Sequence, residues 1–278
     1  MIRRLFNIEK TPQNKIISIL GLKIKLKNTM TQNFATVEDL RAYTLAHQIN
    51  SNLAKYRGAF TGKDVLIVGG GSSLKYLDKL PKDTIKIGIN RAFLLEQIKF
   101  DYLFAQDNFP EEENIEKFIY YKEDTCKKFL GIHPYIADFS IKNSTICRIK
   151  NKELYVLNNR RPNNSLLPKD ISIEPFARYN GTVFSVLQFV LYANARRIYL
   201  AGFDCNVSHM FTKNKIELDL TVQNKYWHEF KKYSNTIYEN CELISINPVN
   251  LKGLFNDVYT QSYVDAHPEL KNENIEIL

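Results

Sequence analysis

The chain has 278 residues, of which 44% are hydrophobic and 24% are charged, an ordinary composition for a globular protein. No run approaches the roughly 20 apolar residues of a membrane-spanning helix, and no apolar run of signal-peptide type follows the basic start MIRRLFNIEK. The four cysteines form no CxxC pair, so we interpret them as free thiols. These features predict a cytoplasmic protein.

The formal net charge is +8, and seven lysines and arginines crowd the first 27 residues against the single acid Glu9. Within this region GLKIKLKN alternates apolar residues with lysines, which predicts a strand with one cationic face. Two interpretations remain open: a solvated edge strand whose lysines block unwanted pairing, or a basic element lying against acidic headgroups of the inner membrane. We therefore predict a basic appendage at 1–30, joined to one domain at 31–278. The sequence contains no basic stripe interleaved with aromatic residues, so it does not indicate binding to nucleic acid. Whether the chain forms a homo-oligomer stays open.

The domain begins with a predicted helix from Thr36, its expected cap, to about Lys55, with Leu40 in its apolar stripe. From residue 63, near-continuous hydrophobic strands alternate with helical segments. The predicted strands are KDVLIVGGG (63–71), TIKIGIN (84–90), FDYLFAQD (100–107), ARRIYLAGFDCN (195–206) and ENCELISINPVN (239–250). Such strands are typical of an α/β Rossmann-like fold, with a mostly parallel sheet and helices on both faces. The apolar segment 181–192 is expected to be a buried helix, and the less regular 108–175 an insertion or lid.

The stretch VLIVGGGSS ends its strand in a glycine loop. Glycines allow close backbone approach to a ligand, serines add donors, and a helix starting here, in SLKYLDKL, would turn its positive N-terminus toward the loop. The loop therefore predicts a phosphate cradle. It is not a dinucleotide fingerprint, because Leu74 takes the sixth position, and no Walker Gly-Lys-Ser/Thr follows. The alternative interpretation is a tight strand-to-helix turn.

Polar residues follow the other predicted strands as well. In open α/β sheets, ligands bind outside the carboxyl ends of the strands, so we expect these residues to converge on one crevice. Asn90 suits contact with a base or ribose, and Asp107 suits ribose hydroxyls or a metal, although each could also be a turn residue or helix cap. The set comprises Asn90-Arg91, Gln106-Asp107-Asn108, Asp204-Cys205-Asn206 and Asn247-Pro248.

Three segments together resemble a known family: VLIVGGGSSLKYLDKLP with IGINRAF, then NGTVFSVLQFVLYANARRIYLAGFD, then LISINPVNLKGLF. They are similar to the bacterial sialyltransferases of glycosyltransferase family 42 and to the related domain of unknown function 115 of motility accessory factors. The matched segments cover about a third of the chain, in the family's order.

The resemblance implies a Rossmann-like transferase that moves a sugar, with inversion, from a cytidine-monophosphate donor to an oligosaccharide or lipid-linked acceptor. It implies no obligatory metal and a place in building lipopolysaccharide or capsule. The residues it assigns to the donor are Gly69, Gly70, Gly71, Ser72, Ser73, Asn90, Asn180, Gly181, Asn247 and Asn250.

This chain departs from the family pattern at several positions. Gly70 and Ser72 replace the family's loop Asn and Pro, and paired tyrosines are not apparent after Asp204. Gln106-Asp107 stands where the family has a strand-end Asn, which leaves open a different base or a divalent metal held by Asp107.

Inverting transfer needs a base that takes the proton of the acceptor hydroxyl, and the near-neutral pKa of an ordinary histidine suits that task. His209 lies five residues past Asp204, at the mouth of the expected crevice. His228 follows Trp227 and lies nearer the family's order of elements. Both stay candidates, and Trp227 could stack on a sugar or pack in the core. The candidates for stabilising the leaving group are Arg91, Arg178, Tyr179 and Lys213.

Two other functions remain in competition. One is a pyrophosphokinase that uses ATP with Mg²⁺ held by Asp107 and Asp204. The other is a nucleotide- or glycan-binding accessory protein without catalysis, which the altered loop allows.

Overall fold

The computed structural model describes residues 6–10, 14–19, 22–27, 37–106, 112–134, 143–158, 168–177, 179, 181–206, 220–237 and 241–278. The chain divides into two compact units, Met1–Val37 and Glu38–Leu278.

The N-terminal unit contains a three-stranded antiparallel sheet in the order β1-β2-β3. Its strands are β1 (Phe6–Lys10), β2 (Asn14–Ile19) and β3 (Leu22–Lys27). The strand predicted from GLKIKLKN is therefore confirmed, and it forms an edge of this sheet, because β3 pairs with β2 alone among the described strands.

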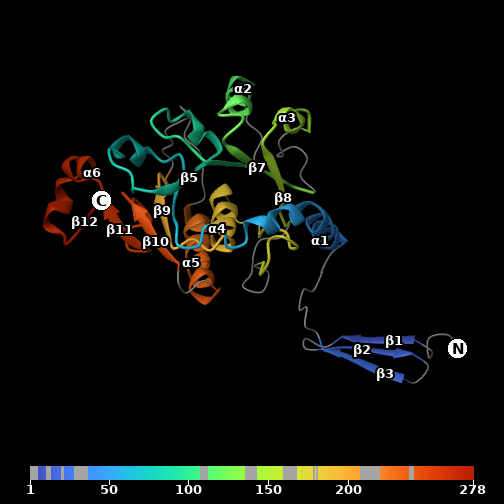
Figure 1. Cartoon of the computed structure of the whole chain (residues 1–278). Coiled ribbons are helices and arrows are strands. Elements are labelled where there is room, and N and C mark those ends of the chain that lie inside the picture. The colour runs from blue at the N-terminus through green and yellow to red at the C-terminus, as the bar shows by residue number, and fades with distance from the viewer. Residues whose placement is uncertain are drawn as a thin grey trace. The chain divides into compact units, whose positions relative to one another are not determined.

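The larger unit is built on nine parallel strands in the order β12-β11-β10-β9-β4-β5-β6-β7-β8 (Figure 1). The α/β prediction is confirmed. The strands are β4 (Asp64–Val68), β5 (Thr84–Ile89), β6 (Tyr102–Ala105), β7 (Lys127–Ile132), β8 (Lys152–Val156), β9 (Arg197–Ala201), β10 (Glu242–Ile246), β11 (Asn256–Tyr259) and β12 (Glu276–Ile277). From β4 the chain runs outward to β8, then returns to place β9 on the other side of β4. The strand order therefore reverses between β4 and β9, which is where ligands bind in such sheets.

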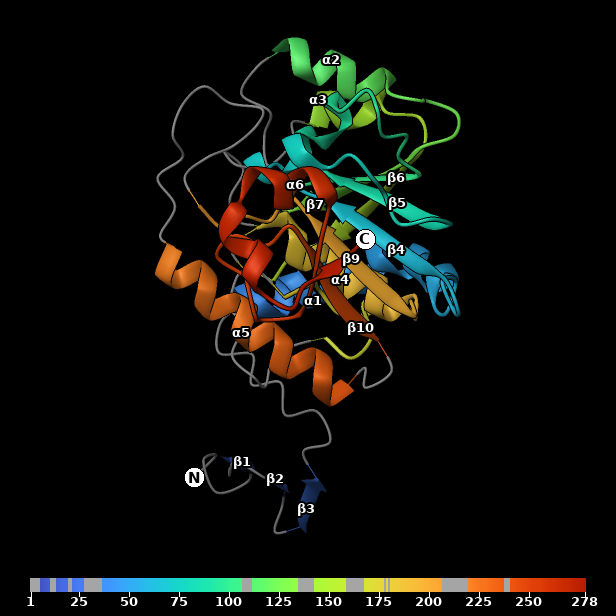
Figure 2. The same ribbon diagram turned by 90° about the vertical axis from the view of Figure 1, so that its left-hand side faces the viewer.

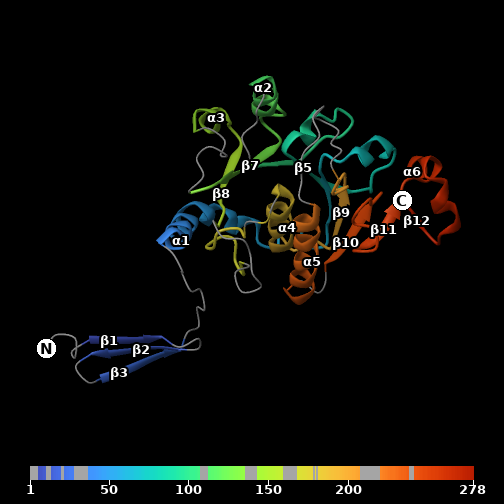
Figure 3. The ribbon, with the colours of Figure 1, turned by 180° about the vertical axis from the view of Figure 1, so that it is seen from behind.

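Helices cover both faces of this sheet. Their bounds are α1 (Val37–Ile49), η2 (Asn50–Tyr56), η3 (Ser72–Tyr76), η4 (Asn90–Leu94), α2 (Glu112–Tyr120), α3 (Asn143–Arg148), α4 (Thr182–Tyr192), α5 (Leu220–Ile237), α6 (Gln261–Ala266) and η6 (Pro268–Asn272), where η marks a 3-10 helix. Figures 1 and 3 show α4 and α5 on one side of the sheet and α2 and α3 on the other. Helix α5 has 18 residues and is seen along its length in Figure 2.

The position of β4 in the sheet explains why its sequence is hydrophobic throughout. Val65 and Ile67 belong to the core beneath α4 and α5, whereas Leu66 and Val68 belong to the core on the opposite face. Successive side chains alternate between the faces, so a strand covered on both sides needs apolar residues at every position. The predicted helix at 181–192 is α4, and all of its residues are buried.

The first helix differs from its prediction in two ways. It ends at Ile49 and continues as the 3-10 helix η2 rather than running as one helix to Lys55. Leu40 is 51% exposed, while Ala42 and Ala46 are fully buried. Small alanines let the helix approach the domain closely, so they, and not the leucine, face inward.

The predicted insertion at 108–175 contains two strands of the main sheet. Strand β7 pairs with β6, and β8 pairs with β7, so these segments are part of the fold's core. Sequence analysis missed them because lysines and a glutamate interrupt KKFLGI and KELYV. Lys128 and Glu153 are nevertheless buried, which is rare unless such a side chain is paired. Residues 159–167, the Asn- and Pro-rich part of the predicted lid, lie outside the described residues.

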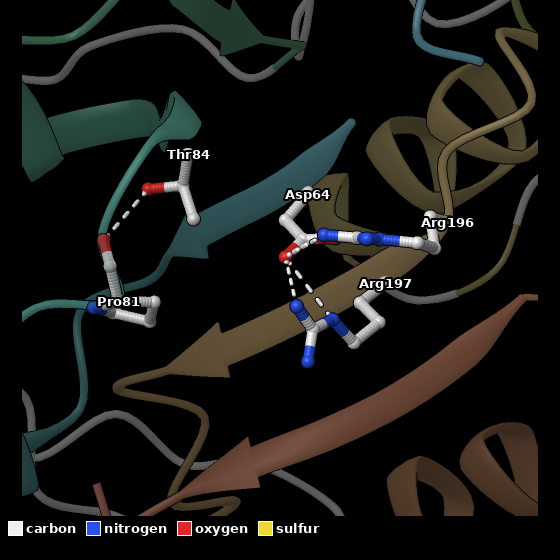
Figure 4. A network of polar contacts seen from close by, with 5 residues as sticks. All are labelled: Asp64, Pro81, Thr84, Arg196 and Arg197. Atoms are coloured by element: carbon white, nitrogen blue, oxygen red, sulfur yellow. Dashed lines mark hydrogen bonds and ion pairs between the residues drawn. The ribbon is translucent and has the colours of Figure 1, made fainter. Parts of the chain in front are cut away.

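Asp64, at the amino end of β4, is the centre of an arginine network (Figure 4). Arg196 Nε and Arg197 Nη2 donate to its two carboxylate oxygens at 2.8 and 2.6 Å. Burial raises the pKa of Asp64, but the hydrogen bonds from the two arginines outweigh it, so the pKa lies below its ordinary value. This stabilisation is present above the ordinary pKa and is lost as the pH falls through the lowered one.

Asp64→Asn is therefore expected to lower the free energy of unfolding at neutral pH by about 1–3 kcal/mol. The arginine side chains are 57% and 38% exposed, so water screens part of the interaction. Urea unfolding at neutral pH measures the change, with the exposed Asp124→Asn as control. Equal losses in the two variants would contradict the expected result.

Lys128 offers a test of the β7 assignment through pH. Its side chain is fully buried, and its Nζ donates to the Tyr121 carbonyl at 2.8 Å. Burial lowers the pKa of Lys128 below its ordinary value of 10.5. Between these two pKa values the unfolded chain binds a proton that the native state has released, so stability rises with pH across this window.

Lys128→Met removes this titration while filling the same space. We expect the unfolding free energy of the wild type to rise relative to that of the variant as the pH is raised from about 7 to 9.5. Urea titrations at both ends of this range measure it. A difference that stays constant would show that Lys128 keeps an ordinary pKa.

Candidate functional site

Unusual backbone conformations gather at the carboxyl ends of the central strands. Asn90 follows β5 with φ of 52°, Cys205 follows β9 with φ of 50°, and Asn247 follows β10 with φ of 50°. Few non-glycine residues adopt positive φ, and such conformations cluster at functional sites. Gly202, with φ of 72°, ends β9 in the same way. The polar residues singled out from sequence thus mark sharp turns at one edge of the sheet.

The glycine loop is tied to the end of β9. The Gly69 N–H donates to the Ala201 carbonyl at 2.9 Å, and the Gly71 N–H donates to the Gly202 carbonyl at 2.8 Å. The helix predicted after the loop is the 3-10 helix η3 of five residues. Such a short turn supplies little dipole, so the expected contribution of a helix N-terminus is missing.

Asp204 occupies the centre of this loop. Its carboxylate, in a side chain that is 2% exposed, accepts hydrogen bonds from the Ser73 N–H at 2.8 Å, the Ser72 hydroxyl at 3.1 Å and the Ser73 hydroxyl. A Cβ at Gly71 would lie 2.5 Å from the Asp204 Cγ, so only glycine fits there. Donors that were expected to face a ligand's phosphate therefore hold a carboxylate of the protein itself.

Two other predicted ligand residues hold strand ends together. Buried Asn247 donates to the Thr260 hydroxyl at 2.9 Å and accepts from the Thr260 N–H at 2.8 Å, which joins the ends of β10 and β11. Asn250 donates through its side chain to the Cys205 carbonyl at 2.8 Å and through its backbone to the Asp204 carbonyl at 3.2 Å. The loop after β10 is thus fastened to the end of β9.

Three further residues of the predicted site lie at the start of α4. Gln106 is buried at the end of β6 and accepts from the Ser185 hydroxyl at 3.2 Å. Asn90 is partly exposed and accepts from the Thr182 hydroxyl at 3.4 Å. Gly181 precedes the first turn of α4 and has φ of 139°, which favours glycine. The start of α4 therefore lies against the ends of β5 and β6.

Several predicted residues lie outside the described residues. They are Asp107, Asn108, Arg178, Asn180, His209 and Lys213. The structure thus gives no position for one of the two candidate bases or for the candidate metal ligand Asp107.

The second candidate base, His228, lines a cavity of about 270 Å³ between α5 and the loop after β10. Its side chain is exposed, and Asn250, which is fastened to the end of β9, lines the same cavity. The cavity that His228 lines thus extends to the loop that is fastened to the end of β9. Trp227, next to it in the chain, is 2% exposed and packs 4.8 Å from the Phe184 ring, so it belongs to the core.

Sequence analysis missed an aromatic group beside the glycine loop. Tyr263 of α6 packs 5.4 Å from the Tyr76 ring at the end of η3. Burial raises the pKa of the Tyr263 phenol, and the nearby Asp204 carboxylate raises it further. The signal was the sequence YTQSYVDAH, with Tyr259 four residues before Tyr263. It was overlooked because the short strand β11 before it was not predicted.

Comparisons with known proteins show a distant likeness. No family model matches the chain, and no curated protein matches it. The chain is similar to the solved structure of the MAf glycosyltransferase from Magnetospirillum magneticum AMB-1, with 12% identity, a TM-score of 0.46 and coverage of 78% of this chain. It spans 38% of that chain's length. Across the described residues, no helix combines the length and apolarity that a membrane span requires.

Proposed function

We propose that the chain is a glycosyltransferase that moves a sugar from a nucleotide donor, with a cytidine-monophosphate sugar favoured, to a cell-surface glycan. The observation that carries this proposal is that the strand order reverses between β4 and β9 and that the loops at this point are joined to each other. Asp204, after β9, holds the glycine loop after β4, and Asn250 is bonded to the Cys205 carbonyl after β9. The reversal point of an open α/β sheet is a nucleotide-binding position. The sequence resemblance supports the same assignment.

In this proposal Asp204 holds the glycine loop in its conformation, and the nucleotide binds on the exposed side of that loop. The partly exposed Asn90, together with Gly70 and Ser72, presents polar groups at that edge. The N–H groups of Gly69, Gly71 and Ser73 are bonded to protein oxygens, so they hold the turn in place. The groups that would stabilise the charge developing on the leaving group are therefore those of Asn90, Gly70 and Ser72, which this turn holds in fixed positions.

His228 then serves as the general base. The proton of the acceptor hydroxyl passes to the imidazole, and the acceptor oxygen bonds to the anomeric carbon of the donor sugar. The bond from that carbon to the phosphate oxygen breaks, and the nucleotide leaves with the electron pair. His209 is the alternative base in this scheme.

The pyrophosphokinase alternative fits this site less well. Its Mg²⁺ would need carboxylate oxygens, and the Asp204 carboxylate already accepts three hydrogen bonds from Ser72 and Ser73. A metal at Asp204 would have to displace donors that hold the loop.

Donor turnover tests the proposal. The purified chain is incubated with CMP-, UDP- and GDP-sugars, each in EDTA and in Mn²⁺, and the released nucleotide is measured by chromatography. We expect slow release of CMP from CMP-sialic acid in EDTA, since transferases often hydrolyse donors without acceptor. An ATP arm with Mg²⁺ and a pterin acceptor measures AMP, which leaves when the diphosphate moves to the acceptor hydroxyl, and so detects the kinase. Release from no sugar nucleotide, with or without metal, would reject the proposal.

A further inference from the structure

The cavity between α5 and the loop after β10 has a basic lining. Asn224, His228 and Lys231 come from α5 and are spaced to share one face of the helix. The loop contributes Asn250, Leu251, Lys252, Gly253 and Leu254. Among the described residues, no acidic side chain lines this cavity. Its chemistry therefore suits a ligand that carries negative charge.

The two lysines can both reach a ligand's anion. Lys252 forms an ion pair with Glu273 at 2.7 Å, but the two side chains are 43% and 45% exposed, so the pair contributes little and exchanges readily with other partners. Lys231 Nζ donates to the Leu254 carbonyl, which orients the ammonium and leaves its charge uncompensated by that bond. His228 adds an imidazole from the same helix as Lys231.

Asn224 adds a different requirement. Its Oδ1 is buried and has no hydrogen-bond partner, which costs free energy unless a donor is supplied. Because Asn224 is partly exposed and lines the cavity, a turn of its amide would bring this oxygen to a ligand hydroxyl. The ligand should therefore combine an anionic group with hydroxyls. The volume of about 270 Å³ lies just under the usual range for drug-sized ligands, which suits one sugar ring better than a whole nucleotide sugar.

We propose that this cavity is the subsite for an acidic sugar of the acceptor, a hexose ring bearing a carboxylate or a phosphate monoester. This inference rests on the proposed function for its role in catalysis, because His228, the proposed general base, lines the same cavity. The binding itself depends only on the lysines, the histidine and Asn224.

The test is binding of glucuronate, glucose 6-phosphate and glucose, measured by saturation-transfer NMR and calorimetry. The first two compare carboxylate with phosphate, and glucose is the neutral reference. We expect both acidic sugars to bind more tightly than glucose. Lys231→Gln and Lys252→Gln should each weaken the acidic sugars about tenfold, the effect of losing one charge-assisted hydrogen bond. Lys225→Gln, which removes a 71% exposed lysine of the same helix outside the cavity, should leave binding unchanged.

The outcomes separate this inference from the proposed function. Glucose binding as tightly as glucuronate, or equal affinities in wild type, Lys231→Gln and Lys252→Gln, would overturn the acidic-sugar subsite. The same samples are tested for stabilisation by CMP, UDP and GDP. Stabilisation by CMP without acidic-sugar binding would reject this inference alone, whereas acidic-sugar binding without any nucleotide effect would support the subsite and reject the transferase. Circular dichroism confirms that each variant is folded.

Discussion

Asp204→Ala is expected to abolish stabilisation by nucleotides and to lower the free energy of unfolding by about 3 kcal/mol, because three donors lose a buried charged acceptor. The Ser73 N–H and the hydroxyls of Ser72 and Ser73 would remain at the centre of the loop without the carboxylate that orders them. Since Gly71 lies against that carboxylate, the loop would also lose this packing contact. Urea unfolding measures stability, and melting temperature with added nucleotide measures binding.

Two further variants separate loop shape from fold stability. Asp204→Asn keeps the volume and one acceptor oxygen, so it should lose less stability than Asp204→Ala. Ser72→Ala removes one hydroxyl bond of 3.1 Å and leaves the Ser73 bonds, so it should cost about 1 kcal/mol of stability and weaken nucleotide binding less than Asp204→Ala does. If Asp204→Ala bound nucleotides as the wild type does, the carboxylate would not be what shapes the site.

His228→Asn is expected to reduce sugar transfer by about 10²–10⁴-fold, the usual contribution of a positioned general base. Its side chain is exposed on α5 and lines the cavity, so the fold should tolerate the change. Nucleotide binding should persist, because the glycine loop and Asp204 are untouched. Turnover is measured with saturating donor, and nucleotide affinity is measured separately.

Histidine controls make this result interpretable. His47→Asn changes an exposed histidine of α1, and it should retain full activity. His209→Asn tests the alternative base. Activity lost in His209→Asn but kept in His228→Asn would transfer the role to His209 and refute His228 as the general base.

The central strands could be predicted because burial on both faces demands apolar residues at every position. The segment VLIV before the glycine loop shows this, as its residues divide between the two cores. Strands β7 and β8 were missed because Lys128 and Glu153 are buried through partners that lie outside their own strands. Glu153, for example, pairs with Lys55 at 2.6 Å. No local pattern reveals such a partner.

That the candidate residues share one end of the sheet was predictable, but their contacts were predictable only in part. Polar residues after parallel strands must share one edge, so Asn90, Gln106, Asp204 and Asn247 were expected together. That Asp204 fills the glycine loop depends on the order of β4 and β9, which the sequence leaves open. The same holds for Asn247, whose partner Thr260 follows a strand of four residues that carries little signal.

Nucleotide binding is the most direct test of the central claim, that the β4–β9 reversal is a nucleotide site. The melting temperature of the chain is measured with CMP, UDP, GDP and ATP, each in EDTA and in Mg²⁺. We predict that CMP stabilises the chain in EDTA, by about 2.7 kcal/mol at a hundredfold excess over Kd. We also predict that this stabilisation is lost in Gly71→Ala, because the new Cβ would collide with Asp204. Stabilisation by UDP or GDP would keep the site and change the donor. No shift with any of the four nucleotides would contradict the claim of a nucleotide site.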